Sequence, residues 1–153
     1  RRQQVKMDHL KERSPKNPDF DIQTDFSSNC TVFEADLLVT DWSGIAYEYA
    51  FTTKKPVLFV DTPMKVMNPE YQKIDTVPIN IWMRDVIGDR LDPAKTEETE
   101  SKVRNLLEQK DAYHDRIEKF VEDYVYNLGN SAEVGAKYIV QAVQEQIKKA
   151  KEQ

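Results

Sequence analysis

The chain has 153 residues, of which 39% are hydrophobic and 32% are charged, and its formal net charge is −5. This size suits one domain better than two, and the absence of a basic excess argues against nonspecific nucleic-acid binding. The single cysteine, Cys30, excludes an internal disulfide and fits a reducing compartment. No apolar run approaches the roughly 18–20 residues that span a bilayer, and no secretory signal is visible.

The N-terminal part of the sequence predicts short elements. Residues 5–13 have the apolar contacts of a short helix, and the proline-containing segment 14–18 breaks it. Residues 20–22 are predicted as a short strand that ends in a Ser- and Asn-rich loop at 25–29. Residues 30–34 are predicted as one helical turn before the main strand.

The clearest pattern is a pair of apolar runs joined by a helix. Residues 37–39 predict a buried strand, residues 40–44 a polar turn, and an amphipathic helix begins at Ile45. A second apolar run, at 56–60, follows one helix length later, after a proline that ends the helix. Such runs are typical of a βαβ unit with parallel strands buried on both faces. We therefore expect a three-layer α/β domain with these strands adjacent in a parallel sheet.

The next segment is less regular. Residues 62–78 predict a long functional or lid-like loop, interrupted by prolines. Residues 81–87 have helix-like apolar spacing, and Gly88 is expected to end that helix. The α/β part of the domain is therefore predicted to extend over residues 1–91.

Residues 92–153 predict a helical C-terminal segment. Asp92-Pro93 resembles a helix start, and Asn130 and Glu133 have capping-box spacing. Each apolar stripe is too narrow for an independent core, so we expect these helices to cover the sheet. The three stripes consist of Val103, Leu106 and Leu107; Tyr113, Ile117, Phe120, Val121 and Tyr124; and Val134, Tyr138, Ile139, Ala142, Val143 and Ile147.

The turn after the first strand is the predicted ligand site. In an open α/β sheet, ligands bind outside the carboxyl ends of the strands, and a helix N-terminus there suits a phosphate. We expect the Ser43 hydroxyl and the N–H groups of Gly44 and Ile45 to hold that phosphate. Gly44 lets a ligand approach the backbone closely. Asp41 would face the ligand, and Glu48 would meet a ribose or polyol hydroxyl.

These residues also have plainer interpretations. Asp41 and Ser43 could simply cap the helix, which is worth about 1 kcal/mol, and Glu48 could be a solvated surface residue. The turn lacks the glycines of a P-loop or a dinucleotide fingerprint. His9 and His114, the only histidines, are predicted at the surface. No metal-ligand spacing or nucleophile elbow is present, so no cofactor and no metal are expected.

Three segments resemble the CDP-glycerol glycerophosphotransferase family of teichoic-acid primases and polymerases. They are residues 34–44, 48–50 and 55–61, and the turn at 127–132 is similar to a further family segment. The resemblance implies a Rossmann-like domain, the C-terminal donor-binding half of a GT-B fold. The function it implies is transfer of glycerol phosphate, or a related polyol phosphate or sugar, to a cell-wall polymer.

The chain departs from the family pattern in two ways. Gly44 replaces a second serine, so one hydroxyl remains for a phosphate, and Trp42 replaces a tyrosine. The family's upstream Arg-Pro-His-Pro segment and acceptor-side domain are absent. The resemblance therefore implies a fragment that does not catalyse transfer alone.

The resemblance also implies a mechanism and partners for the complete protein. The pyrophosphate of a donor such as CDP-glycerol would lie at Ser43 and Gly44, and Glu48 would meet a donor hydroxyl. A base from the missing N-terminal domain would activate the hydroxyl of a polymer or lipid-linked acceptor for attack on phosphorus or an anomeric carbon. The implied location is the cytoplasm, or the periphery of the inner face of the cell membrane.

Three other functions remain open at this point. The chain could belong to a GT-B glycosyltransferase of another donor class. It could be a receiver-like domain phosphorylated on Asp41, although Asp25 has no acidic neighbour and no receiver lysine is evident. Residues 92–150 could instead form a helical interaction module.

Overall fold

The computed structural model describes residues 2–13, 17–24, 30–64, 68 and 70–151. The chain divides into two compact units, residues 1–34 and residues 35–153.

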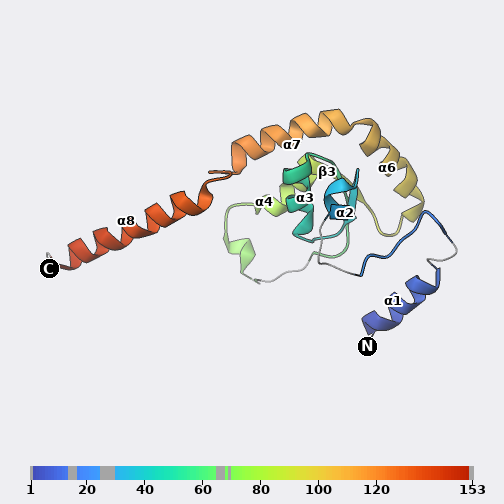
Figure 1. Ribbon diagram of the computed structural model, residues 1–153, viewed down its shortest axis with the longest axis horizontal. Helices are drawn as coiled ribbons and strands as arrows, with labels where there is room; N and C mark the ends of the chain where they lie inside the picture. Colours follow the sequence, from blue (N-terminus) through green and yellow to red (C-terminus); the bar gives the residue numbers. More distant parts are fainter. Residues whose placement is uncertain (1, 14–16, 25–29, 65–67, 69, 152–153) are drawn as a thin grey trace. The chain divides into compact units, whose positions relative to one another are not determined.

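The first unit contains two helices, α1 (Arg2–Arg13) and α2 (Cys30–Glu34), as the sequence predicted (Figure 1). The strand expected at 20–22 is wrong, because this segment has no regular structure. The Ile22 N–H is bonded instead to Asp21 Oδ1 at 2.8 Å. A local side-chain bond of this kind competes with a strand ladder for the backbone. The predicted loop at 25–29 lies outside the described residues.

The second unit is built on a three-stranded parallel sheet with strand order β1-β2-β3. The strands are β1 (Leu38–Thr40), β2 (Val57–Val60) and β3 (Gly88–Leu91), and helix α3 (Ile45–Thr53) connects the first two (Figure 1). The expected parallel pairing of the two apolar runs is confirmed. The architecture is an α/β fold with an open parallel sheet, consistent with part of a Rossmann-like domain.

Strand β2 is central, which explains its continuous apolar sequence. Val57, Leu58 and Phe59 are all buried, although successive side chains point to opposite faces of a sheet. Strand β1 lies at an edge of the described sheet, and its residue Val39 is 49% exposed. Leu38 and Thr40 on its other face are only half-buried, so the prediction of a strand buried on both faces is wrong for β1, which has a neighbouring strand on one side only.

Strand β3 is absent from the sequence prediction. A Cβ atom on Gly88 would lie only 1.8 Å from the carbonyl oxygen of Val57, so the two strands approach too closely for a side chain there. The segment that precedes β3 was expected to be one helix over 81–87. It is instead divided into α4 (Ile79–Trp82) and α5 (Arg84–Ile87). The preceding crossover contains the short 3₁₀ helix η2 (Tyr71–Lys73).

The C-terminal helices begin later than the Asp92-Pro93 pair predicts. Asp92 Oδ1 accepts a hydrogen bond from the Ala94 N–H at 2.9 Å, so this cap stabilises a turn and not a helix. The 3₁₀ helix η3 (Thr96–Glu98) follows that turn. Three α-helices complete the chain: α6 (Thr99–Glu108), α7 (Lys110–Tyr124) and α8 (Ser131–Lys151).

Helices lie on both faces of the sheet. Lys102 Nζ of α6 lies 2.8 Å from Asp89 Oδ2 of β3, so α6 covers the face on which Asp89 stands. On the opposite face, the Arg84 guanidinium of α5 lies over the ring of Phe59. Helices α3 and α5 pack beneath α7 on that second face. The predicted three-layer arrangement is therefore present.

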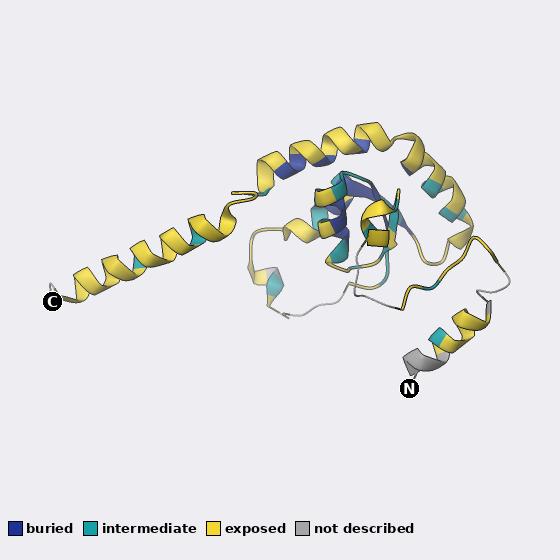
Figure 2. Cartoon of the chain, in the orientation of Figure 1, coloured by how far each residue is buried: buried dark blue, intermediate teal, exposed yellow. Residues whose placement is uncertain are grey.

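Helix α8 differs from α6 and α7. The latter two bury Leu106, Tyr113, Ile117, Phe120 and Val121, whereas α8 has no buried residue (Figure 2). Helix α6 packs on the sheet, α7 packs on α3 and α5, and α8 buries none of its residues. The division into an α/β part and a helical cover remains a prediction.

Candidate functional site

The five predicted site residues lie together where β1 ends and α3 begins. Asp41, Ser43 and Gly44 form the turn, and Ile45 and Glu48 belong to the first turn of α3. Asp41, Ser43, Gly44 and Glu48 are exposed, and Ile45 is half-buried. The carboxyl end of β1 therefore presents exposed polar side chains to solvent.

The hydrogen bonds at the start of α3 join backbone groups only. Ser43 O accepts from the Ala46 N–H at 3.3 Å, and Gly44 O accepts from the Tyr47 N–H at 3.1 Å. No side chain caps the helix among the described residues. The plainer interpretation of Asp41 and Ser43 as helix caps is therefore wrong, and the Ser43 hydroxyl is not used for that purpose.

Gly44 is not required by the backbone conformation. Its φ of −61° and ψ of −22° are ordinary for any residue. A Cβ atom there would meet nothing within 4 Å. What the glycine provides is open space beside the N–H groups at the start of α3.

Directly behind this turn lies a buried arginine that the sequence analysis missed. Arg84 is fully buried, and its Nη2 lies 2.8 Å from Asp61 Oδ1 at the exit of β2. The guanidinium carbon is 3.9 Å from the centre of the Trp42 ring and 4.7 Å from that of Phe59. This arrangement is a cation between two aromatic faces with one carboxylate partner.

Two further contacts extend this cluster. Trp42 Nε1 donates a hydrogen bond to the Thr62 carbonyl at 2.8 Å. This bond links the residues that follow β1 to those that follow β2. Arg90 lies between two carboxylates, with its Nε 2.8 Å from Asp85 Oδ1 and its Nη1 4.0 Å from Asp61 Oδ2. The two arginines and two aspartates carry no net charge together.

The sequence offered only weak signals for this cluster. Asp61 was recognised as the end of a segment that resembles the family, and Trp42 as a departure from the family pattern. Arg84 lies in a short amphipathic segment in which an arginine is normally solvated. Its burial depends on the pairing of β2 with β3, and β3 has no apolar run to reveal it.

Tyr47 lies on α3 beside the same cluster. Its hydroxyl donates to the Asn80 carbonyl at 3.0 Å and thereby connects α3 to α4. Burial raises the pKa of Tyr47, and the positive charge of Arg84 partly opposes that rise. This phenol is therefore a neutral hydrogen-bond donor near neutral pH.

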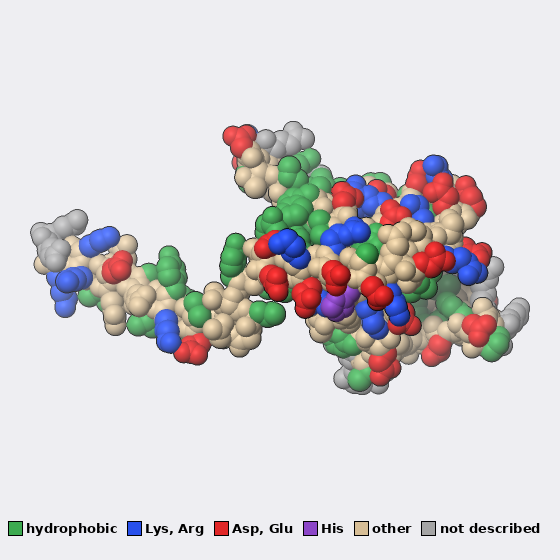
Figure 3. Space-filling view, turned by 90° about the horizontal axis from the view of Figure 1, so that it is seen from above, with side chains coloured by type: hydrophobic (Ala, Val, Ile, Leu, Met, Phe, Trp, Pro, Cys, Tyr) green, Lys and Arg blue, Asp and Glu red, His purple; other side chains and the backbone are tan. Residues whose placement is uncertain are grey.

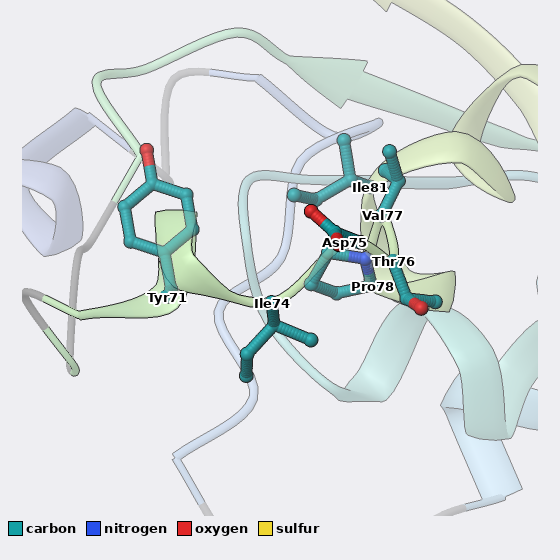
Figure 4. A pocket seen from close by; sticks show the side chains of 7 residues that line it. All are labelled: Tyr71, Ile74, Asp75, Thr76, Val77, Pro78 and Ile81. Atoms are coloured by element: carbon teal, nitrogen blue, oxygen red, sulfur yellow. The ribbon is translucent and has the colours of Figure 1, made fainter.

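A separate cavity of about 200 Å³ lies in the crossover between β2 and α4 (Figure 4). It contains none of the predicted site residues, and Asp75 is its one charged lining residue. Its lining is otherwise mainly apolar and consists of Tyr71, Ile74, Thr76, Val77, Pro78 and Ile81.

Other site types find no support in the described part of the chain. No group of three or more His, Cys, Asp or Glu side chains there could hold a metal ion. His9 and His114 are exposed, as predicted. On the face seen in Figure 3, acidic and basic side chains are interspersed and form no broad basic patch. None of the described helices combines the length and apolar character needed to cross a bilayer.

The fold and the strand-exit turn define an α/β domain whose polar surface lies at the carboxyl edge of a parallel sheet. Residues 6–143 match the family described as CDP-glycerol:poly(glycerophosphate) glycerophosphotransferase, and the chain belongs to this family. Neither the curated proteins nor the solved structures provide a match. Membership identifies a glycerophosphotransferase-like transferase and confirms the family resemblance found in the sequence.

Proposed function

We propose that this chain is the donor-binding domain of an enzyme that transfers glycerol phosphate from CDP-glycerol to a cell-wall polymer. The observation that carries the proposal is the open, uncapped start of α3 at the carboxyl end of β1, in a chain of the glycerophosphotransferase family. Unpaired N–H groups at a helix start bind phosphate oxygens, and the helix dipole favours the negative charge.

In this proposal each residue of the turn has one task. The Ser43 hydroxyl and the N–H groups of Gly44 and Ile45 bind the donor's pyrophosphate. Glu48 accepts a hydrogen bond from a ribose or glycerol hydroxyl. These groups stabilise charge that develops on the leaving phosphate, so the chain supplies electrostatic stabilisation and orientation at the donor.

The acceptor's base is assigned to a facing domain and not to this chain. His114 follows Tyr113, whose hydroxyl contacts the Gly88 carbonyl at the amino end of β3. That end of the sheet is opposite to the turn at Ser43. His114 is therefore poorly placed to deprotonate an acceptor hydroxyl at the donor site.

The acceptor and the location belong to the same proposal. The acceptor would be a polymer or lipid-linked hydroxyl of teichoic-acid type. The enzyme would work in the cytoplasm, at the inner face of the cell membrane. A donor of another class, such as a nucleotide sugar, is the competing assignment that the following titration distinguishes.

The test is a titration of the 153-residue chain with CDP-glycerol, followed by backbone amide chemical shifts. CDP, glycerol 3-phosphate and a UDP-sugar serve as comparison ligands. We expect the largest shifts at Ser43, Gly44 and Ile45, with weaker binding of the comparison ligands. Shifts confined to α6, α7 and α8 would contradict the proposed site.

A matched pair of serine variants sharpens this test. Ser43→Ala removes one hydrogen bond to the phosphate, and we expect CDP-glycerol binding to weaken about three- to tenfold. Ser101→Ala is the control, because the Ser101 hydroxyl donates to the Glu98 carbonyl on the surface of α6. Equal affinity of both variants would remove Ser43 from the site.

A further inference from the structure

Arg84 is the one charged side chain in the fully buried set of the described residues, and the proposed function does not use it. A guanidinium group has five N–H donors. Here only Nη2 has a partner, Asp61 Oδ1 at 2.8 Å, and this contact is an ion pair without good hydrogen-bond alignment. Nε and Nη1 have no hydrogen-bond partner among the described residues.

Such burial is unfavourable for stability alone. An unpaired N–H group in the interior costs free energy, and apolar side chains of similar volume replace buried ion pairs without loss in other proteins. Methionine would fill much of the same space between Trp42 and Phe59. The position therefore retains an arginine for a reason other than core packing.

The contacts of Arg84 indicate that reason. Its guanidinium faces Trp42, the residue that immediately precedes Ser43, at 3.9 Å from the ring centre. Its ion pair holds Asp61, which directly follows β2. One side chain of α5 thus contacts the exit of both neighbouring strands. The Trp42 indole completes the link by donating to the Thr62 carbonyl at 2.8 Å.

Arg84 cannot bind a ligand directly, because its nitrogen atoms are buried beneath these neighbours. The charges of Asp61, Asp85 and Arg90 neutralise its own, so the cluster does not attract a phosphate through net charge. Any effect of Arg84 on the site must therefore pass through the orientation of Trp42 and Asp61.

We propose that Arg84 is a positioning residue for the donor-phosphate site. Its guanidinium lies between the rings of Trp42 and Phe59 and holds the Trp42 ring in place, and this fixes the orientation of the Ser43 and Gly44 groups that follow in the chain. Arginine suits this task because its planar cation stacks on an aromatic ring while its edge reaches a carboxylate. The identity of the ligand in this inference rests on the proposed function.

The test compares Arg84→Met, Arg84→Lys and the control Arg104→Met in the 153-residue chain. Arg104 is exposed on α6 and pairs only with Glu100 among the described residues. A Trp82→Phe background leaves Trp42 as the one tryptophan. The free proteins are measured through the indole and amide resonances of Trp42, Ser43 and Gly44. CDP-glycerol affinity is then measured well below each variant's melting temperature.

We expect Arg84→Met to fold, to shift the Trp42 indole and the Ser43 and Gly44 amides, and to weaken CDP-glycerol binding about tenfold. Arg84→Lys keeps the charge and loses the planar stack, so its affinity should lie between those of Arg84→Met and the parent protein. Arg104→Met should leave both the resonances and the affinity unchanged. A folded Arg84→Met protein with unchanged Ser43 and Gly44 resonances would overturn the inference.

The two proposals fail in different ways. If the parent protein does not bind CDP-glycerol, the proposed function is wrong, and the resonances of the free variants still decide whether Arg84 positions the turn. If the parent protein binds and a folded Arg84→Met protein binds equally well, Arg84 has no role at the site. Should Arg84→Met not fold, Arg84→Lys carries the test. That variant keeps the charge and loses the planar stack on Trp42, so unchanged Ser43 and Gly44 resonances would then overturn the inference.

Discussion

The two crossovers of the sheet use their polar residues in opposite ways. Between β1 and β2, Asp41, Ser43 and Glu48 are exposed, and the start of α3 is uncapped. Between β2 and β3, Asp61 and Arg84 are engaged with each other, and Arg84 is fully buried. The polar groups of the first crossover are available to bind a ligand. Those of the second crossover pair with each other and fix the positions of the strand ends.

Replacement of Gly88 would break the second crossover most severely. The Cβ atom of Gly88→Ala would lie 1.8 Å from the Val57 carbonyl oxygen, so β2 and β3 must separate. We expect a loss of about 3 kcal/mol or more in the free energy of unfolding, or no folding at all. Denaturant unfolding checks this. Gly135→Ala is the control, because its Cβ would meet nothing within 4 Å. Equal stability of the two variants would contradict the close approach of the strands.

Loss of the carboxylate charge at Asp61 should be nearly as costly. Asp61→Asn leaves the buried Arg84 charge without its ion pair, which lowers the free energy of unfolding. Because the side chain of Asp61 is 36% exposed, water partly compensates, and we expect a loss of about 2 kcal/mol. Asp85→Asn is the matched control. Its side chain is 64% exposed and pairs with Arg90, so its loss should stay below about 1 kcal/mol. Thermal and urea unfolding of both variants measure the difference, and an equal loss would mean that the two ion pairs are equivalent.

The first crossover should respond in binding and not in stability. Gly44→Ala places a methyl group in the open space beside the helix start without straining the backbone. We expect CDP-glycerol affinity to fall about tenfold while the unfolding midpoint changes little. Isothermal titration and thermal unfolding measure the two quantities. Unchanged affinity would show that no ligand approaches the backbone at Gly44.

The smallest effect concerns Tyr49, a buried residue of α3 in the first crossover. Burial raises the pKa of Tyr49 from 10.0 to about 12, and its hydroxyl donates to the Ala35 carbonyl at 2.8 Å. Below pH 10 the phenol is protonated in both the folded and unfolded states, so its contribution to stability is complete. Between pH 10 and about 12 the unfolded phenol ionises first, and that contribution is lost.

The measurement is the free energy of unfolding from pH 8 to 12. We expect Tyr49→Phe to be less stable at pH 8, because it lacks the bond to Ala35, and to lose less stability above pH 10. Tyr126→Phe is the control, since Tyr126 is 76% exposed. Parallel pH curves for the parent protein and Tyr49→Phe would contradict the raised pKa.

The same contrast explains what could be predicted from the sequence. The apolar runs of β1 and β2 are local signals, so their parallel pairing and the turn at Ser43 were predictable. The burial of Arg84 and the strand at Gly88 depend on residues that are distant in the chain. Their local sequence resembles a helix with a C-terminal glycine, because nothing nearby records how closely β3 approaches β2.

Two predictions of regular structure, the helix start at Asp92 and the strand at 20–22, failed for a different physical reason. Asp92 accepts a hydrogen bond from a nearby N–H group and forms a turn, and Asp21 accepts one from the Ile22 N–H where a strand was expected. Short polar side chains offer the backbone a local alternative to regular structure. The apolar stripe of α8 was predicted correctly as a helix, but periodicity alone does not specify which surface covers it.

The position of Arg84 also has a consequence for the order of folding. Helices α6 and α7 form from contacts between near neighbours in the chain, which is fast. Arg84 contacts Trp42, Phe59 and Asp61, which lie on different segments of the chain. These contacts are complete only after β2 has paired with both β1 and β3. The guanidinium can therefore lose its water only once these distant segments have assembled, so its dehydration depends on the whole sheet and not on α5 alone.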